Sequence, residues 1–383
     1  MRKWTNALTI LILIVVIAAA ALWLRSGNFA APKETPAPVP TETAAPAPTQ
    51  TPAPTPEPTP EPTPEPTPEP TPELFTLSFV GDCTLASSQH HKGSAYAFET
   101  VVGEDYAYPF AATLAYFADD YCSFANLEST FTTAAANNGG TFVFKSDPVY
   151  AQVLTEGSIE FVTLANNHAN DFLAAGAADT RAALDALGVG YAGECESYLY
   201  QRDDGPVIGI FCQLYPELYG PDKTVAGVQA LREAGAEIII CAMHWGIEGS
   251  YQVLASQKAV AYAAIDAGAD LIWGSHPHVL HSVEEYNGKY IFYSLGNWSF
   301  GGNTAPRDRD TAIAQIVVTR EVDGSLHLGE PILIPCKLSG HDAYNDYQPQ
   351  PYDPEQPEYD RAMSKLDGRW NGPDLNIDYS AFH

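Results

Sequence analysis

Basic residues are scarce in this chain. Its 383 residues include only 19 Lys and Arg against 47 Asp and Glu, which gives a formal net charge of −28. A protein that binds nucleic acid needs a basic stripe to meet the phosphates, and none is visible, so we expect no nucleic-acid partner. Part of the acidity lies in a proline-rich stretch, so the rest of the chain is less extreme; the acids there are Glu34, Glu42, Glu57, Glu61, Glu65, Glu69 and Glu73.

A regular cysteine framework is also missing. The chain has six cysteines but no CxxC motif. Two of them lie inside apolar, strand-like runs and a third begins such a run, which is a common setting for buried free thiols. Six cysteines would allow three disulfides in an exported chain. We nevertheless expect mostly reduced thiols at Cys83, Cys122, Cys195, Cys212, Cys241 and Cys336.

Residues 1–30 contain an apolar run that predicts a membrane segment. Ala7 to Leu24 carries no charge over eighteen residues, close to the shortest helix that crosses about 30 Å of hydrocarbon. Arg2 and Lys3 precede the run, which favours an N-terminus on the cytoplasmic side. The alternative is a cleaved signal peptide, since Ala18–Ala21 offers small residues for cleavage. Either interpretation exports the rest of the chain, as a single-pass membrane protein with its C-terminal domain outside or as a secreted one.

Residues 31–73 form a linker of Pro, Thr, Ala and Glu that becomes a TPEP repeat from Thr55 onward. Such a sequence buries no apolar area, and dense proline favours extended polyproline II. At about 3.1 Å per residue the linker would reach on the order of 130 Å. It is either a spacer that holds the domain away from the membrane or a disordered tether, and both have the same geometry.

Residues 74–340 alternate short apolar strands with helical stretches, and then become purely β in character. Asn287-Gly288 between two apolar runs predicts a hairpin, and Gly188 is expected to end a helix in the left-handed conformation. Alternating βα units followed by hairpins indicate two mixed sheets flanked by helices. The tail, residues 341–383, is rich in Asp, Tyr and Pro, lacks periodicity and is expected to be loosely ordered. Helices are expected at residues 108–120, 148–156, 173–187, 226–234 and 253–267.

Polar side chains that bind metals or carry protons stand where five apolar runs end. Open α/β folds place ligand chemistry beyond the carboxyl ends of their strands, so we expect these side chains to form one site. Taken singly, each has another explanation: Asp82 as a helix N-cap, Glu128 as a surface acid, and the asparagines as turn formers. The five groups are Asp82, Asn126 with Glu128, Asn166 with Asn167 and His168, His244 with Glu248, and His276 with His278.

His276-Pro277-His278 is the strongest of these motifs. The proline favours an extended backbone, in which residues two apart face the same side, so two imidazoles would face one ion. The alternative is a pair of ordinary loop histidines. His244 would complete a set of three imidazoles, and mixed with carboxylates these suit zinc, iron or manganese. Glu248 is expected behind the ligands, accepting a ring N–H and fixing the tautomer.

The motifs GDCTL, NLEST, LANNHAND, HWGIE, GSHPHVLHSVEEYNGK and YSLGNWSF occur in this order over about residues 75–335. Together they resemble the capsule-biosynthesis CapA family of bacterial poly-γ-glutamate synthesis proteins, which is related to the calcineurin-like metallophosphoesterases. The resemblance implies an α/β fold of the metallophosphoesterase type, a four-layer α/β/β/α sandwich with two sheets between helices.

The resemblance also implies roles for the site residues. His168 would protonate the leaving group, with Asn166 beside it as a second catalytic residue, and Asn126, Glu248 and Asn297 would support the ligands or contact the substrate. The family pattern has a histidine two residues after the first aspartate, where this chain has Thr84, which weakens one of two metal positions. The implied ligands of one or two manganese, zinc or iron ions are Asp82, Glu128 (or Asn126), Asn167, His244, His276 and His278.

The function implied is a membrane-anchored, extracytoplasmic protein of capsule or envelope polymer synthesis, acting through a hydrolase-type metal site. One alternative is a non-catalytic component that binds the polymer or supports a capsule synthase complex. Another is a phosphatase or phosphodiesterase. The expected partners are an anionic envelope polymer or its precursor, and the membrane through the N-terminal helix.

Overall fold

The computed structural model describes residues 71–377, which fall within one compact unit, Pro68–His383. The expected membrane segment and nearly all of the linker lie outside the described residues. Within residues 71–377, no helix combines the length and the apolar character needed to cross a bilayer.

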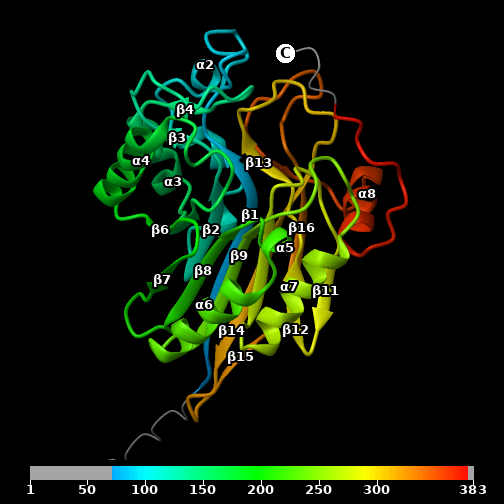
Figure 1. Cartoon of the computed structure of the whole chain (residues 1–383). Helices are drawn as coiled ribbons and strands as arrows, with labels where there is room; N and C mark the ends of the chain where they lie inside the picture. Colours follow the sequence, from blue (N-terminus) through cyan, green and yellow to red (C-terminus); the bar gives the residue numbers. More distant parts are fainter. Residues whose placement is uncertain (1–70, 378–383) are drawn as a thin grey trace, which may run out of the picture. The chain divides into compact units, whose positions relative to one another are not determined.

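Two β-sheets form the centre of this unit (Figure 1). In the larger sheet, β13 also pairs with β1, and β15 with β14. Its main order is β17 (Gln350–Pro351), β16 (Ile332–Lys337), β14 (Asp310–Arg320), β1 (Glu73–Thr84), β2 (Cys122–Leu127), β5 (Phe161–Thr163) and β6 (Gly190–Ala192), with β13 at Asn297–Phe300 and β15 at Leu326–Leu328. The smaller sheet has the order β11 (Val283–Tyr286), β12 (Lys289–Phe292), β10 (Leu271–Ser275), β9 (Ile238–His244), β8 (Ile208–Leu214) and β7 (Glu196–Tyr200).

The apolar side chains form three layers of core. Alternate residues of a strand face opposite sides of its sheet: Phe79 of β1 packs between the sheets against Trp273 of β10, while Val80 faces outward. Helices α3 (Gln152–Glu156) and α4 (Leu173–Leu187) cover the outer face of the larger sheet. Helices α6 (Asp222–Glu233) and α7 (Ala255–Asp266) cover that of the smaller. The described chain is therefore a mixed α/β fold with helices outside two packed sheets.

Parallel pairing sets the position of the site. β1, β2, β5 and β6 run parallel to one another, as do β8, β9 and β10. The carboxyl ends of each set therefore meet at one edge of their sheet. In the larger sheet, Asp82 is in register with Asn126 on one side and Asn297 on the other. In the smaller, His244 is in register with Ser275.

Several expected local elements are confirmed. α4 ends at Gly188 in the left-handed conformation, with φ 72°. The Asn287-Gly288 turn, with φ of 51° and 72°, joins β11 to β12 as the predicted hairpin, and positive φ at both residues matches a turn that follows the strand twist. All six cysteines lie in the described residues and are free thiols, as expected.

One expected helix is wrong. Residues 108–120 contain only two short 3₁₀ turns, Tyr108–Phe110 and Leu114–Tyr116. Between them the Thr113 hydroxyl donates to the carbonyl oxygen of Phe110 at 3.2 Å. A side-chain hydroxyl that bonds nearby backbone competes with helix formation, so apolar spacing alone overpredicted this element.

The tail differs from the loosely ordered segment expected. It contributes β17 and helix α8 (Pro357–Leu366), which lies beside β16 (Figure 1). Ala362 and Leu366 of α8 are fully buried in the core between the sheets. Lys365 is also buried, paired with Asp308 and Asp310. The apolar face of α8 follows the i, i+3, i+4, i+7 spacing of an amphipathic helix at Tyr359, Ala362, Met363 and Leu366, a short periodicity that the expectation overlooked.

Candidate metal centre

The carboxyl ends of the strands bring a carboxylate and imidazoles from three segments together. Glu128 follows β2, His244 ends β9, and the histidine pair follows β10. Glu128 Oε1 lies 3.6 Å from His244 Nε2 and 3.8 Å from His278 Nε2, and the His244 and His276 ring centres are 4.7 Å apart. Two ligands of one ion at about 2.1 Å bonds in tetrahedral geometry stand about 3.4 Å apart. The spacing therefore suits a shared cation.

Glu128 gives the clearest sign of a cation site. Both of its carboxylate oxygens are buried and have no hydrogen-bond partner among residues 71–377. Burial raises the pKa of this carboxyl well above its usual value, although the nearby His278 opposes the rise. A buried charge without partners is costly unless it is paired or coordinates a metal. The donor set around Glu128 fits a divalent ion.

His244 and His276 are held in the neutral form that metal ligation requires. Burial lowers the pKa of His244 well below its usual value, and that of His276 to about 4, with His278 adding to the effect. His244 Nδ1 lies 2.9 Å from Ser275 Oγ, while its Nε2 lies 2.8 Å from Asn167 Oδ1. His276 Nδ1 is buried with no hydrogen-bond partner in the described part of the chain. His276 can therefore offer a lone pair to the cluster, and His244 can offer one at Nε2 in the tautomer whose Nδ1–H is donated to Ser275 Oγ.

His278 differs from these two imidazoles. Its Nδ1 lies 2.8 Å from Asn297 Oδ1 and 3.1 Å from Asp82 Oδ2. Burial lowers the pKa of His278, but Glu128 and Asp82 outweigh it and raise the pKa to about 10. Ligating imidazoles are neutral, so a cation at its Nε2 would have to displace a proton.

Buried amides hold the carboxylates in place. Asn126 Nδ2 donates to Asp82 Oδ1 at 2.7 Å, and Asn126 Oδ1 accepts from Asn166 Nδ2 at 3.0 Å. Asn166 also donates to the Leu127 carbonyl at 2.8 Å and accepts from the His168 backbone N–H at 3.1 Å. Asn166 is buried and fully occupied by these bonds. Through these bonds Asn166 positions Asn126 and the end of β2, and the catalytic role implied by the resemblance stays a prediction.

His168 lies at the edge of the cluster with one nitrogen committed. Its Nδ1 lies 2.9 Å from Asp171 Oδ2, and Asp171 also accepts the Phe144 backbone N–H at 2.8 Å. The ring stands edge-on to Phe144 at 4.5 Å and keeps 15% of its side-chain surface exposed. Nε2 is left to meet a ligand. Asp171 went unnoticed in the sequence, although it stands three residues after His168.

The histidine pair converges in a different way from the one expected. The backbone is not extended, because φ is 98° at His276 and 58° at His278. The loop instead turns around Asp82, which accepts the His276 backbone N–H at 3.2 Å. The two ring centres still lie 6.0 Å apart. Proline restricts the residue before it, but the hydrogen bond to Asp82 and the surrounding packing decided the conformation.

Three further residues, Thr84, Glu248 and Tyr215, lie close to the cluster. The hydroxyl of buried Thr84 donates to the Glu128 carbonyl oxygen at 3.3 Å, so it supports the backbone of a ligand. Glu248 comes within 4.8 Å of ligand atoms of both His276 and His278. Tyr215, absent from the sequence prediction, presents its ring edge to His276 at 5.2 Å, from a left-handed backbone that ends β8.

A cavity of about 280 Å³ opens beside the cluster. Polar site residues form one side of it, and aromatic rings form another. The end of the described chain supplies a third, apolar wall. The residues of these walls are His168, Glu248, His278 and Asn297; Phe142, Phe144 and Phe300; and Leu375 and Ile377, with His91 and Arg307 also in the lining.

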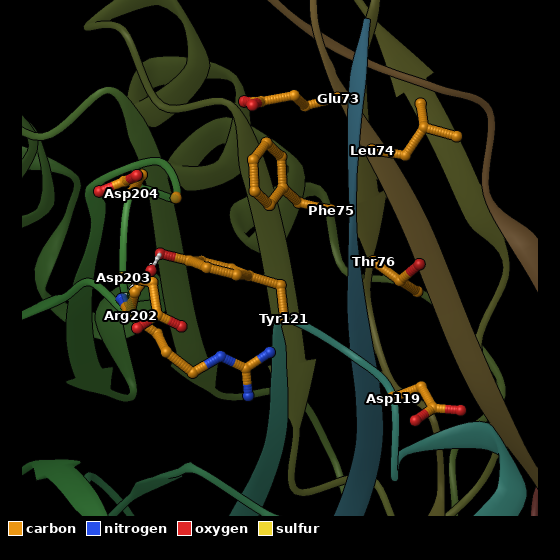
Figure 2. A pocket seen from close by; sticks show the side chains of 10 residues that line it. Glu73, Leu74, Phe75, Thr76, Asp119, Tyr121, Arg202, Asp203 and Asp204 are labelled. Atoms are coloured by element: carbon orange, nitrogen blue, oxygen red, sulfur yellow. Dashed lines mark hydrogen bonds between the residues drawn. The ribbon is translucent and has the colours of Figure 1, made fainter. Parts of the chain in front are cut away.

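A second cavity, of about 430 Å³, lies far along the larger sheet at the N-terminal end of β1 (Figure 2). Glu73, Asp203 and Asp204 give it an acidic lining, and the Tyr121 hydroxyl points to the Arg202 backbone, whose N–H donates to it at 2.9 Å. Its lining residues are separate from the metal cluster and from the 280 Å³ cavity beside it.

Comparison with known proteins agrees with the motifs. A family model described as "Bacterial capsule synthesis protein PGA_cap" matches residues 76–208 and 212–301. The chain belongs to this family. The CapA resemblance indicated by the sequence is confirmed, and every candidate ligand lies within the matched residues of the PGA_cap family. The apolar wall at Leu375 and Ile377 lies outside them.

Individual relatives carry related names. PGA biosynthesis protein CapA of Bacillus subtilis (strain 168) is 35% identical over 184 residues, 43% of this chain and 48% of the relative. Capsule biosynthesis protein CapA of Bacillus anthracis is 28% identical over 270 residues, 63% of this chain and 64% of the relative. The chain thus spans less than two thirds of the length of either. Among solved structures, Haemophilus influenzae NAD nucleotidase (NadN) aligns over 78% of this chain and 63% of its own, at 11% identity and a TM-score of 0.38.

Proposed function

We propose that this protein is a metal-dependent hydrolase that acts on a phosphoester or γ-glutamyl amide bond during synthesis of a capsule or envelope polymer of the poly-glutamate type. One observation carries the catalytic part: the orphaned Glu128 carboxylate, buried among His244, His276 and His278. The names of the PGA_cap relatives support the biological setting.

The ligands follow from the geometry. Glu128 bridges between the His244 and His278 rings, while Asp82 and the Asn167 amide oxygen approach from the larger sheet. A divalent manganese, zinc or iron ion held there would supply Lewis acidity at the scissile bond. Asn126 and Asn297 fix the orientation of Asp82 and His278, as supporting hydrogen bonds do around metal ligands.

The protein's own proton donor is His168. With Nδ1–H donated to Asp171, the ring presents Nε2 to the cavity. In the imidazolium form, oriented by the Asp171 carboxylate, Nε2–H can protonate the leaving group as the bond breaks. The aromatic wall beside it excludes water from this side, which strengthens electrostatic interactions at the reacting atoms.

The test uses the full-length protein in detergent. Metal content, measured by inductively coupled plasma mass spectrometry, should fall in the double variant His276→Ala/His278→Ala and stay unchanged in His168→Ala. Turnover of phosphoester and γ-glutamyl amide substrates, each with and without added manganese, should disappear in both variants. Unchanged metal content in the double variant would show that this histidine pair does not hold the metal, and it would refute the proposal.

The same assays separate the alternatives. Binding of poly-γ-glutamate without turnover of any substrate would favour a polymer-binding or scaffold component, the reading that the non-ligating Thr84 supports. Turnover confined to phosphoesters would favour a phosphodiesterase or phosphatase. The cavity admits a small group, because its 280 Å³ is at the lower end of ligand pockets.

The proposed location is outside the cytoplasmic membrane, with residues 1–30 as the anchor and residues 31–73 as the spacer. The apolar run Ala7–Leu24 supports this placement. In a bacterial host, protease added to intact spheroplasts should degrade the C-terminal domain. A domain that stays protected until the cells are lysed would refute the placement.

A further inference from the structure

Glu248 lies in the loop after β9, four residues beyond His244, and its carboxylate approaches the imidazoles of the next loop. One of its oxygens, one nitrogen of His276 and one nitrogen of His278 all lie within 4.8 Å of one another. Its side chain is partly buried and forms part of the wall of the 280 Å³ cavity. We propose that Glu248 is a direct ligand of a second, cavity-facing cation position, shared with His276 and His278. This inference rests on the proposed metal-dependent function.

The two positions differ in their access to solvent. The group Glu128, His244 and His276 is buried throughout, with exposures of 1%, 1% and 5%. In the Glu248 group, only His276 is buried, and Glu248 and His278 both face the cavity. An ion held by Glu128 is therefore enclosed, while an ion held by Glu248 meets water and substrate.

Shared histidines limit how the positions are filled. A neutral imidazole has one lone pair to offer, so His276 binds one ion at a time. When both positions are filled, the enclosed ion can keep Glu128 and His244, and the cavity-facing ion can keep Glu248 and His278. Each position then has one carboxylate and one imidazole of its own, so the ligands of the two positions carry the same charge.

The loop around Glu248 is fixed on both sides. Gly246 N donates to Glu217 Oε1 at 2.9 Å, and Gly249 N donates to the Pro277 carbonyl at 2.8 Å. Pro277 stands between the two histidines, so this backbone bond ties the Glu248 loop directly to them. Gly246 and Gly249 have φ of 91° and 71°, a conformation that favours glycine. The carboxylate is thus presented to the histidine pair by a constrained turn.

Glu248 also explains how the chain manages without an imidazole at position 84. Thr84 is fully buried, and its hydroxyl bonds the Glu128 carbonyl. β1 therefore supplies one ligand, Asp82, to the cluster. Glu248 brings a carboxylate from the other sheet, and carboxylates suit manganese-type ions better than they suit soft ones.

The experiment measures binding and needs no substrate. The full-length protein is stripped of metal and titrated with Mn²⁺ by equilibrium dialysis, while the relaxation rate of water protons is recorded. Wild type should bind a tight ion with little effect on relaxation and a weaker ion that enhances it. Glu248→Gln should keep the first and weaken the second by at least about tenfold, since even supporting residues of a metal site cost 10- to 100-fold.

The matched control is Glu330→Gln, an identical change at an exposed residue just after β15. It should behave as wild type, and Glu248→Asp should fall between wild type and Glu248→Gln. Equal melting temperatures of the stripped proteins exclude misfolding. Identical titrations of Glu248→Gln and the control would overturn the inference. So would loss of every bound ion in Glu248→Gln, because the two positions would then be one. Wild type that binds no Mn²⁺ at all would instead refute the proposed function.

Discussion

Replacement of Lys365 should destabilise the fold strongly, because its buried ammonium group holds two carboxylates. Its side chain is 3% exposed, and the ammonium group donates to Asp308 at 2.8 and 2.7 Å and to Asp310 at 2.8 Å. Lys365→Met keeps the length of the side chain but removes the charge. Among residues 71–377, Asp308 then keeps two donors, the Tyr251 hydroxyl at 2.8 Å and the Asp310 backbone N–H at 3.0 Å.

The expected loss is about 3 to 5 kcal/mol in the free energy of unfolding, the usual cost of removing one partner of a buried ion pair. That is a large share of the roughly 5 to 15 kcal/mol that stabilises a typical protein. The Asp310 carboxylate loses less stabilisation than that of Asp308, because Arg361 still binds both oxygens of Asp310, at 2.9 and 2.7 Å. Most of the loss should therefore come from Asp308.

Urea unfolding followed by circular dichroism measures the change. The double variant Lys365→Met/Asp308→Asn should recover part of it, because the unpaired carboxylate is gone. Arg361→Met, at a side chain 41% exposed, serves as the comparison and should cost less. A loss below about 1 kcal/mol for Lys365→Met would refute the reasoning, since the pair would then behave like an exposed one.

Three further predictions concern pH, proton transfer and metal affinity. The Asp310 carboxyl is buried, which raises its pKa, but its hydrogen bonds and the cations beside it outweigh burial and lower the pKa. The stability that this carboxylate gives the fold should be complete above about pH 4 and should be lost as the pH falls through the lowered pKa. Urea unfolding should show this loss as a falling midpoint concentration. Asp171→Asn should keep the metal but reduce turnover, because His168 loses the carboxylate that fixes its ring orientation at 2.9 Å. A change in metal content would contradict this. Asn126→Ala should weaken metal binding about 10- to 100-fold, because Asp82 loses the 2.7 Å hydrogen bond that holds its carboxylate. Isothermal titration with Mn²⁺ measures this, and an unchanged affinity would contradict the reasoning.

Much of the site was predictable because its residues stand directly after apolar runs. Asp82, Glu128, His244 and the histidine pair each stand at or just beyond the end of a strand that the apolar pattern identifies, and parallel strands bring their carboxyl ends together. The glycine before Asp82 is required by its surroundings. A Cβ at Gly81 would lie 1.8 Å from the Gly296 carbonyl oxygen, so only glycine fits there.

The roles of the supporting residues were harder to predict. Asn166 and Asn167 are adjacent and chemically identical, yet Asn166 turns inward to Asn126 and Leu127 while Asn167 reaches His244. Which way a side chain turns depends on neighbours that are forty to eighty positions away in the chain. No local pattern carries that information.

The sequence by itself determined most of the strands, the end of α4 at Gly188, the hairpin and the residue types that a cation would need, because these depend on periodicity and on turn chemistry over a few residues. Only the tertiary structure decided that α8 of the acidic tail packs into the core between the sheets, that the histidine loop curls around Asp82, and that Glu248 meets the histidine pair. Each of these depends on contacts between distant segments, where burial and pairing of charge outweigh local preference.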